Sequence, residues 1–132
     1  GPVLSANEAA KSLDIARQGR GPLCLEAIGV EYADTFTRTL FVTFAPSAPL
    51  QAFSDALKNA SQTPCEYTLN PHLSLLYHSG LSDAEKQRLA RSVSVPLGEL
   101  RFDALAAVWI PSEPRGKADV EQWRILARQP LL

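Results

Sequence analysis

The chain has 132 residues, a formal net charge of −1 and a hydrophobic content of 45%, which is the size and composition of one ordinary globular domain. No apolar run reaches the roughly 18 to 20 residues that a membrane span needs, and we expect no secretory leader. The small net charge argues against broad electrostatic binding to long nucleic acid. We therefore expect residues 1–132 to form a single cytoplasmic domain that has no membrane partner.

The two cysteines predict neither a disulfide nor a metal site. Cys24 and Cys65 lie far apart in the sequence and form no C-x-x-C pair, so two reduced thiols in a cytosolic protein are the expected state. Two cysteines and two histidines at no recognisable ligand spacing do not predict structural zinc. We expect no structural metal site and no cofactor.

Turn residues and hydrophobic periodicity divide the chain into helices and largely antiparallel strands. Ser5 and Glu8 form a capping-box pattern at the start of the first helix, and Ser82 and Glu85 repeat it later. This alternation predicts an α+β fold, an antiparallel sheet with flanking helices. In chain order we predict a helix at 6–18, strands at 23–32 and 36–44 joined by a turn at 33–35, a helix from 47 onwards, a strand from 71 to about 78, a helix at 82–92, a strand near 100–110, a polar loop at 111–119 and a strand at 122–127.

The most informative segment is Asn70-Pro71-His72-Leu73-Ser74-Leu75-Leu76-Tyr77-His78, which has the composition of a buried strand. Side chains two apart on a strand point the same way. We therefore expect His72 and Ser74 to project together from one face of a sheet, and Tyr77 to face the opposite side. An imidazole beside a hydroxyl is a reasonable half of a phosphate-handling site.

Residues 71–77, Pro-His-Leu-Ser-Leu-Leu-Tyr, and the Ser-Asp-Ala-Glu-Lys helix start that follows resemble one catalytic segment of the two-histidine (2H) phosphoesterases. That family has the pattern His-x-Thr/Ser-hydrophobic twice, once in each pseudo-symmetric lobe, and this segment is similar to the second copy. The resemblance spans about residues 36–128 and includes Trp123, which is expected in the final strand. It implies the family's α+β fold with its N-terminal strand missing from this chain.

The resemblance implies metal-independent hydrolysis of a cyclic phosphate or an RNA-end phosphodiester, with a small phosphorylated nucleotide or RNA end as substrate. In the family, one histidine accepts a proton from water, the other protonates the departing sugar oxygen, and the hydroxyls bind the non-bridging oxygens. An imidazole suits both histidine roles because its ordinary pKa, about 6.5, lies near neutral pH. Matched by position, His72 takes one of these roles and Ser74 binds phosphate.

Four further residues are candidates for binding the substrate. On the family's pattern, Thr43 is the polar candidate for the floor of the groove. Arg115 and Lys117 lie in a loop that contains proline and glycine, where solvated charges are the default and a cationic flap over an anionic substrate is the alternative. Trp109 is either a core residue at a strand end or a stacking surface for a base. Arg38 is a further cation without an assigned role.

The first copy of the motif is absent from the 132 residues, and His78 cannot replace it. Six residues of extended strand separate His78 from His72 by roughly 20 Å, whereas a catalytic group must come within about 3 Å of the proton that it moves. Three explanations stay open. A longer native chain carries the motif upstream of Gly1, a missing strand is completed by self-association at an exposed sheet edge, or catalysis is lost and the domain binds a ligand or itself.

Overall fold

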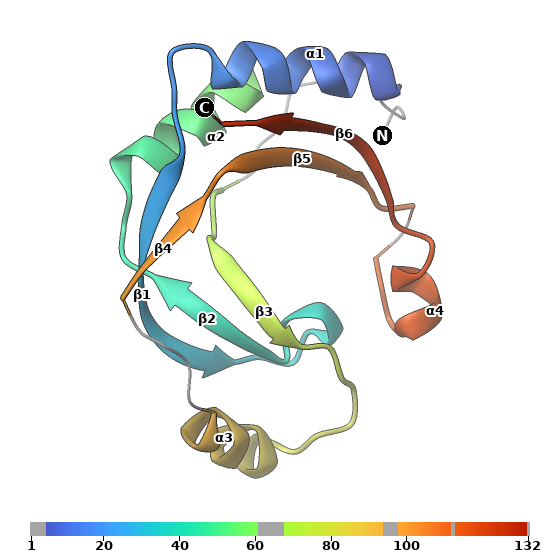
Figure 1. Cartoon of the computed structure of the whole chain (residues 1–132). Coiled ribbons are helices and arrows are strands. Elements are labelled where there is room, and N and C mark those ends of the chain that lie inside the picture. Colours follow the sequence, from blue (N-terminus) through green and yellow to red (C-terminus); the bar gives the residue numbers. More distant parts are fainter. Residues whose placement is uncertain (1–4, 61–67, 94–97, 112, 132) are drawn as a thin grey trace.

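The computed structural model describes residues 5–60, 68–93, 98–111 and 113–131. Helices and antiparallel strands alternate along the chain (Figure 1), which confirms the predicted α+β class. In chain order the elements are α1 (Ala6–Arg17), β1 (Leu23–Tyr32), the 3₁₀ helix η1 (Phe36–Arg38), β2 (Leu40–Phe44), α2 (Ala48–Ala60), β3 (His72–Leu76), α3 (Asp83–Ser92), β4 (Gly98–Phe102), β5 (Ala104–Trp109), α4 (Lys117–Val120) and β6 (Arg124–Pro130).

The strands form two antiparallel sheets. Four strands pair in the order β3-β2-β1-β4, and β5 pairs with β6. Only Asp103 separates β4 from β5, so the chain passes from one sheet to the other at this residue. Figure 1 shows the two sheets as the sides of an arch, with β3 and α4 near its two ends.

The hydrophobic core lies where the two sheets meet. In β1, Leu23, Leu25 and Ala27 are buried while the residues between them are exposed, which is the alternation of a strand with one covered face. Leu23 belongs to a core cluster with Phe53 of α2 and Leu131. The core therefore joins the start of β1, one helix and the end of the described chain.

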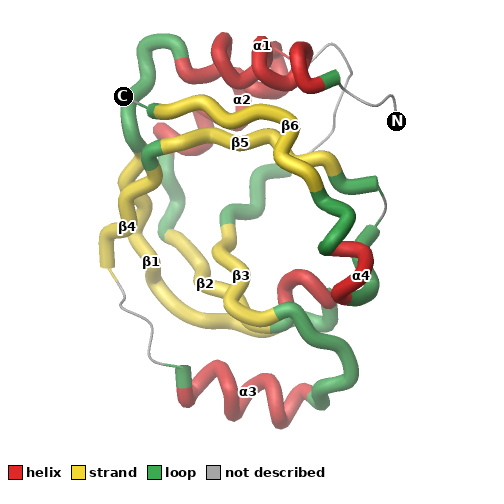
Figure 2. Tube along the Cα trace, turned by 45° about the vertical axis from the view of Figure 1, so that its right-hand side comes forward, coloured by secondary structure: helices red, strands yellow, loops and turns green. Residues whose placement is uncertain are grey.

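The helices lie on the outer sides of the arch. α1 packs against β6 and α2, and α3 packs against β1 (Figure 2). The Ser5 hydroxyl accepts the backbone N–H of Glu8 at 3.1 Å. The Ser82 hydroxyl accepts that of Glu85 at 3.2 Å, so both predicted helix starts are confirmed. Within the described residues, no helix has the length and apolar character that crossing a membrane would need.

Two predicted strands have the wrong bounds. Residues 36–38 form η1, and β2 begins only at Leu40. The Thr39 hydroxyl oxygen lies 3.3 and 3.2 Å from the carbonyl oxygens of Thr35 and Phe36, and such local side-chain-to-backbone contacts compete with extended backbone. The predicted strand at 100–110 is divided at Asp103, a residue type that is disfavoured in strands.

The C-terminal segment also differs from its prediction. The predicted loop at 111–119 contains the start of α4, where the Arg115 backbone N–H donates to the Asp119 carboxylate at 2.9 Å. The last strand is Arg124–Pro130 rather than 122–127, so Trp123 precedes it. Pairing with β5 continues as far as Pro130, which is tolerated because a strand end needs no ladder donor.

β3 is an edge strand and not the buried strand that its composition predicted. It pairs with β2 on one side, and Leu73 and Leu75 are 41% and 40% exposed. Its pairing with β2 becomes irregular between Leu40 and Phe41, so simple alternation does not extend to Tyr77. Tyr77 follows the end of the strand and is 39% exposed, so it is not a core residue.

Lys86 connects α3 to the segment that follows β1. Its side chain is only 3% exposed, and its ammonium donates to the Asp34 carboxylate and, at 3.3 Å, to the Ala33 carbonyl oxygen. Asp83 provides a second carboxylate at 3.3 Å, and the nitrogen lies 5.9 Å from the centre of the Tyr32 ring. The hydrogen bond to Asp34 raises the pKa of Lys86 above its ordinary value.

Replacing Lys86 by Met should lower the melting temperature at pH 7, because the Asp34 carboxylate and the Ala33 carbonyl lose their donor. A group whose pKa is raised by folding stabilises the fold fully below its unfolded pKa, and this contribution is lost as the pH rises through the folded value. The difference in melting temperature between wild type and Lys86→Met should therefore shrink above about pH 10.5.

Lys11→Met is the matched control, because Lys11 is an exposed lysine of α1 without an ion pair to any described residue. It should melt close to wild type at pH 7. Equal melting temperatures for Lys86→Met and wild type would contradict the role given to Lys86.

Candidate functional site

His72 and Ser74 lie on the same face of the four-stranded sheet. His72 is directly opposite Thr43 of β2, and Ser74 is directly opposite Phe41. Opposite residues in an antiparallel pair point to the same side, as do residues two apart along one strand. The four side chains therefore share one face, which confirms the predicted common direction of His72 and Ser74.

The His72 ring is exposed, and its hydrogen bonding distinguishes its two nitrogens. Nδ1 lies 2.9 Å from the backbone carbonyl oxygen of Asn70. A carbonyl oxygen can only accept, so Nδ1 carries the proton in this hydrogen bond. Nε2 of the neutral ring then has a free lone pair. The ring also contacts Phe41 edge to face, with the ring centres 6.0 Å apart. A ring so placed can accept a proton at Nε2 and later return it.

Two hydroxyls accompany the imidazole. The half-buried Ser74 hydroxyl donates to the Thr37 carbonyl oxygen at 2.6 Å, so it must rotate away before it can donate to an anion. The Thr43 hydroxyl lies 3.4 Å from the Gly29 carbonyl oxygen, which is long for an O–H donor. Thr43 thus has the weaker attachment and lies directly opposite His72.

Arg38 is also part of this surface, although sequence reasoning gave it no role. Its guanidinium carbon lies 5.4 Å from the centre of the Phe41 ring, the same ring that His72 contacts. A continuous strand over 36–44 would have put residues 38 and 41 on opposite faces. The 3₁₀ turn η1 removes that restriction, and no signal in the sequence indicated the turn.

The other three predicted residues lie elsewhere. Trp109 is half-buried at the end of β5, with the Arg124 guanidinium carbon 4.9 Å from a ring centre. The Lys117 ammonium lies 3.7 Å from the Glu121 carboxylate, and the Arg115 side chain is exposed. Among the described contacts, none joins Trp109, Arg115 or Lys117 to His72 or Ser74.

An aromatic contact connects the end of β3 with the segment after α4. The rings of Tyr77 and Trp123 have centres 6.2 Å apart, and Phe36 lies 5.9 Å from Tyr77. The indole nitrogen of Trp123 is buried and has no hydrogen-bond partner among the described residues. His78 follows Tyr77 and is exposed, as predicted. This contact places the α4 segment at the end of β3 that is remote from His72.

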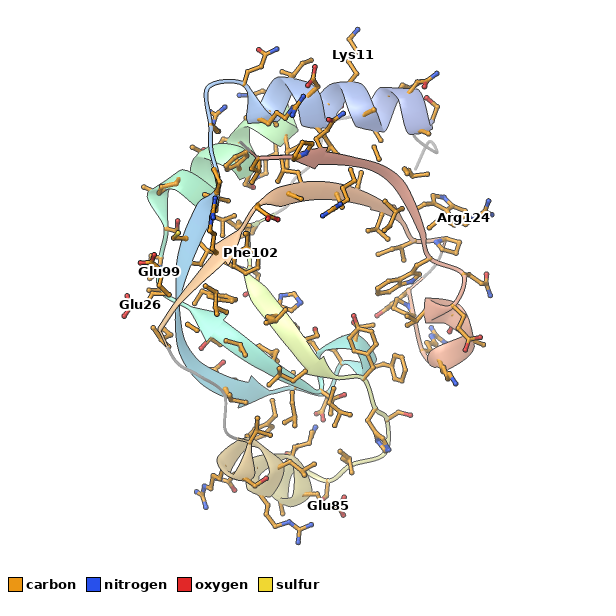
Figure 3. All side chains as sticks on the ribbon, viewed as in Figure 1. Lys11, Glu26, Glu85, Glu99, Phe102 and Arg124 are labelled. Carbon is orange, nitrogen blue, oxygen red and sulfur yellow. The ribbon has the colours of Figure 1, made fainter. Side chains whose placement is uncertain are left out.

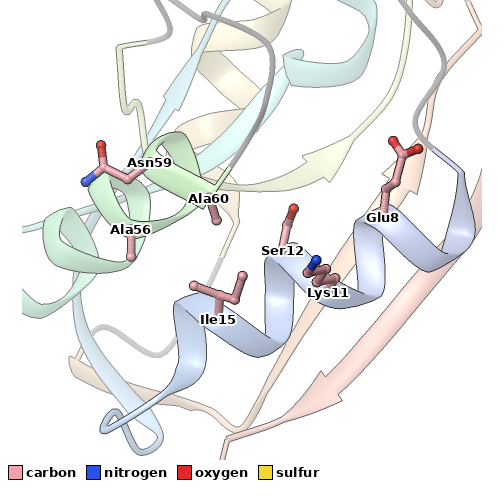
Figure 4. A pocket seen from close by; sticks show the side chains of 7 residues that line it. All are labelled: Glu8, Lys11, Ser12, Ile15, Ala56, Asn59 and Ala60. Atoms are coloured by element: carbon pink, nitrogen blue, oxygen red, sulfur yellow. The ribbon is translucent and has the colours of Figure 1, made fainter.

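Several surface cavities are lined by other residues. A cavity of about 370 Å³ lies between α1 and α2 (Figure 4), and its lining includes Glu8, Lys11 and Asn59. A smaller one of about 120 Å³, near Lys86 and His78, lies beyond the end of β3. Neither includes His72 or Ser74, which are on an open face of the sheet. Within the described residues, no three His, Cys, Asp or Glu side chains gather as a metal site would require.

No protein-family model matches the sequence, and no curated protein is similar enough to count as its relative.

A free thiol lies outside this face, at Cys24 on the exposed side of β1. Figure 3 shows Glu26 and Glu99 on the outside of the arch, where they are directly opposite each other on β1 and β4. A hydrogen bond to the Glu99 carboxylate, together with desolvation and the Glu99 charge, raises the pKa of the Cys24 thiol, while Arg101 opposes this effect. The thiolate is the nucleophile, so the Glu99 carboxylate disfavours the reactive form of this exposed thiol.

Glu99→Gln should speed the alkylation of Cys24 by iodoacetamide at pH 8, because the change removes the negative charge that disfavours the thiolate. The rate is measured by mass spectrometry of the peptide that contains Cys24, which separates it from Cys65. Glu113→Gln, a change at an exposed glutamate elsewhere, should leave the rate unchanged. An unaltered rate in Glu99→Gln would show that Glu99 does not control this thiol.

Proposed function

We propose that the face carrying His72 and Ser74 belongs to a metal-independent phosphodiesterase that opens a cyclic phosphate or hydrolyses an RNA-end phosphodiester. The main support is an exposed imidazole with Nδ1 bonded to a backbone carbonyl and Nε2 unengaged among the described residues, two positions from a hydroxyl on the same face. This is the half-site that the resemblance to the two-histidine phosphoesterases implies. Two antiparallel sheets in an arch are compatible with the two lobes of that family.

In the proposed reaction, Nε2 of His72 accepts a proton from a water molecule while the water oxygen forms a bond to phosphorus. The bond between phosphorus and one ribose oxygen breaks, and this oxygen takes a proton from a second acid or from solvent. Hydroxyl donors, of which Ser74 and Thr43 are the candidates, stabilise the charge on the non-bridging oxygens. For a 2′,3′-cyclic nucleotide, the product is a nucleoside monophosphate.

His72→Ala should reduce the hydrolysis of a 2′,3′-cyclic nucleotide by about 10²–10⁴-fold, which is the usual contribution of one general acid or base. His78→Ala is the matched control, since it removes the chain's other histidine from an exposed position beyond β3. It should keep the wild-type rate, and EDTA should leave that rate unchanged. Wild-type activity in His72→Ala would contradict the proposal.

Exposed apolar side chains on the smaller sheet favour a second candidate, a domain that associates with itself. Ile125 is 66% exposed and Val108, directly opposite it, is 44% exposed. Ile110 follows at 48%. In the described part of the chain, β5 and β6 pair only with each other, so each has an edge that a second copy could extend.

This candidate predicts a concentration-dependent dimer in sedimentation equilibrium. Ile125→Lys should weaken the dimer, because a charged side chain would have to be desolvated at the contact. Gln122→Lys, at an exposed position before β6, adds the same charge and should not. A wild-type chain that is monomeric at all concentrations would exclude self-association through this face.

A further inference from the structure

We infer that Arg38 binds the phosphate group of the substrate beside His72, an inference that rests on the function proposed for that face. The Phe41 ring joins the two side chains. Its centre lies 5.4 Å from the Arg38 guanidinium carbon and 6.0 Å from the centre of the His72 ring. The separation between the Arg38 guanidinium carbon and the centre of the His72 ring therefore cannot exceed the sum of these two distances. Both side chains therefore border the same aromatic ring, on the face proposed to bind the substrate.

The turn that carries Arg38 is attached directly to the strand that carries His72. The Ser74 hydroxyl donates to the Thr37 carbonyl oxygen at 2.6 Å. The His78 backbone N–H donates to the Phe36 carbonyl oxygen at 3.1 Å, and the buried Thr39 hydroxyl donates to the His78 carbonyl oxygen at 2.7 Å. These bonds flank Arg38 on both sides in sequence, so its backbone position relative to β3 is defined.

The chemistry of the site requires a cation that His72 cannot supply. A histidine that acts as a base is neutral before it accepts the proton, so it does not balance the charge of a phosphodiester anion. The Ser74 hydroxyl is neutral and already donates to a carbonyl oxygen. A guanidinium is charged at every working pH and can donate two parallel hydrogen bonds to a phosphate.

Arg38 is available for this role. Among the described residues, its guanidinium has no carboxylate within 4.0 Å and no hydrogen-bond acceptor. Several other cations are occupied, because Lys86 is bonded to Asp34 and Lys117 is paired with Glu121. The contact with Phe41 orients the Arg38 side chain toward the His72 face and leaves its N–H donors unused.

The test measures binding of inorganic phosphate by NMR, through the ring C–H signals of the two histidines in the chain. In the wild type, phosphate should shift the His72 signal saturably. Arg38→Met keeps an apolar stem against Phe41 but loses the charge, and it should bind phosphate roughly 10- to 100-fold more weakly, the usual cost of losing a hydrogen bond to a charged group. Arg38→Lys should show intermediate affinity, because it keeps the charge without the two parallel donors.

Arg88→Ala, at an exposed arginine of α3, is the matched control and should bind as the wild type does. Phosphate affinity that is equal in Arg38→Met and wild type, or no shift of the His72 signal in any form, would overturn the role of Arg38. Hydrolysis assays separate the two proposals. Arg38-dependent phosphate binding without turnover would support the anion site and contradict the phosphodiesterase. Turnover that depends on His72 and not on Arg38 would support the phosphodiesterase and contradict the role of Arg38.

Discussion

An edge strand bonds to its sheet on one side only, so the position of β3 depends on a few specific hydrogen bonds. β2 supplies the ladder of backbone hydrogen bonds. Thr37 of η1 and Thr39, which follows η1, supply the remaining hydrogen bonds to Ser74 and His78. Thr39 is 2% exposed, and its hydroxyl both donates to the His78 carbonyl oxygen and accepts the His78 N–H. Leaving such buried groups unpaired costs about 1–3 kcal/mol each. This arrangement holds Ser74 and the turn that carries Arg38 in a defined relation to each other.

The candidate site and the hydrophobic core are in different parts of the molecule. The core is formed where the sheets meet, by residues such as Phe53 and Leu131, which are each 2% exposed. The His72 face is open, and its apolar member, Phe41, contacts both a cation and an imidazole. A substitution of His72 therefore removes the proposed proton acceptor without opening a cavity in the core. This separation allows activity and stability to be tested independently.

Net charge conceals how the charges are distributed. The formal charge of −1 suggests no preference for anions, yet several cations are neutralised locally. Arg17 pairs with Asp14, and Lys86 lies between Asp34 and Asp83. Arg38 instead lies over an aromatic ring and has no described carboxylate partner. A single local cation of this kind can bind a small phosphorylated ligand even where the whole chain would not attract a long nucleic acid.

Local chemistry decided the helix starts and the direction of the key side chains. Ser5 and Ser82 cap helices because each hydroxyl bonds an N–H three residues away, and two-residue periodicity alone puts His72 and Ser74 on one face. Only the tertiary structure decided that β3 is an edge strand, that Asp103 divides two sheets, and that Arg38 lies beside Phe41. The bonds responsible join groups far apart in the chain, as Ser74 to Thr37 does across 37 residues. Periodicity records only which face of its own element a residue occupies, so it carried no information about these partners.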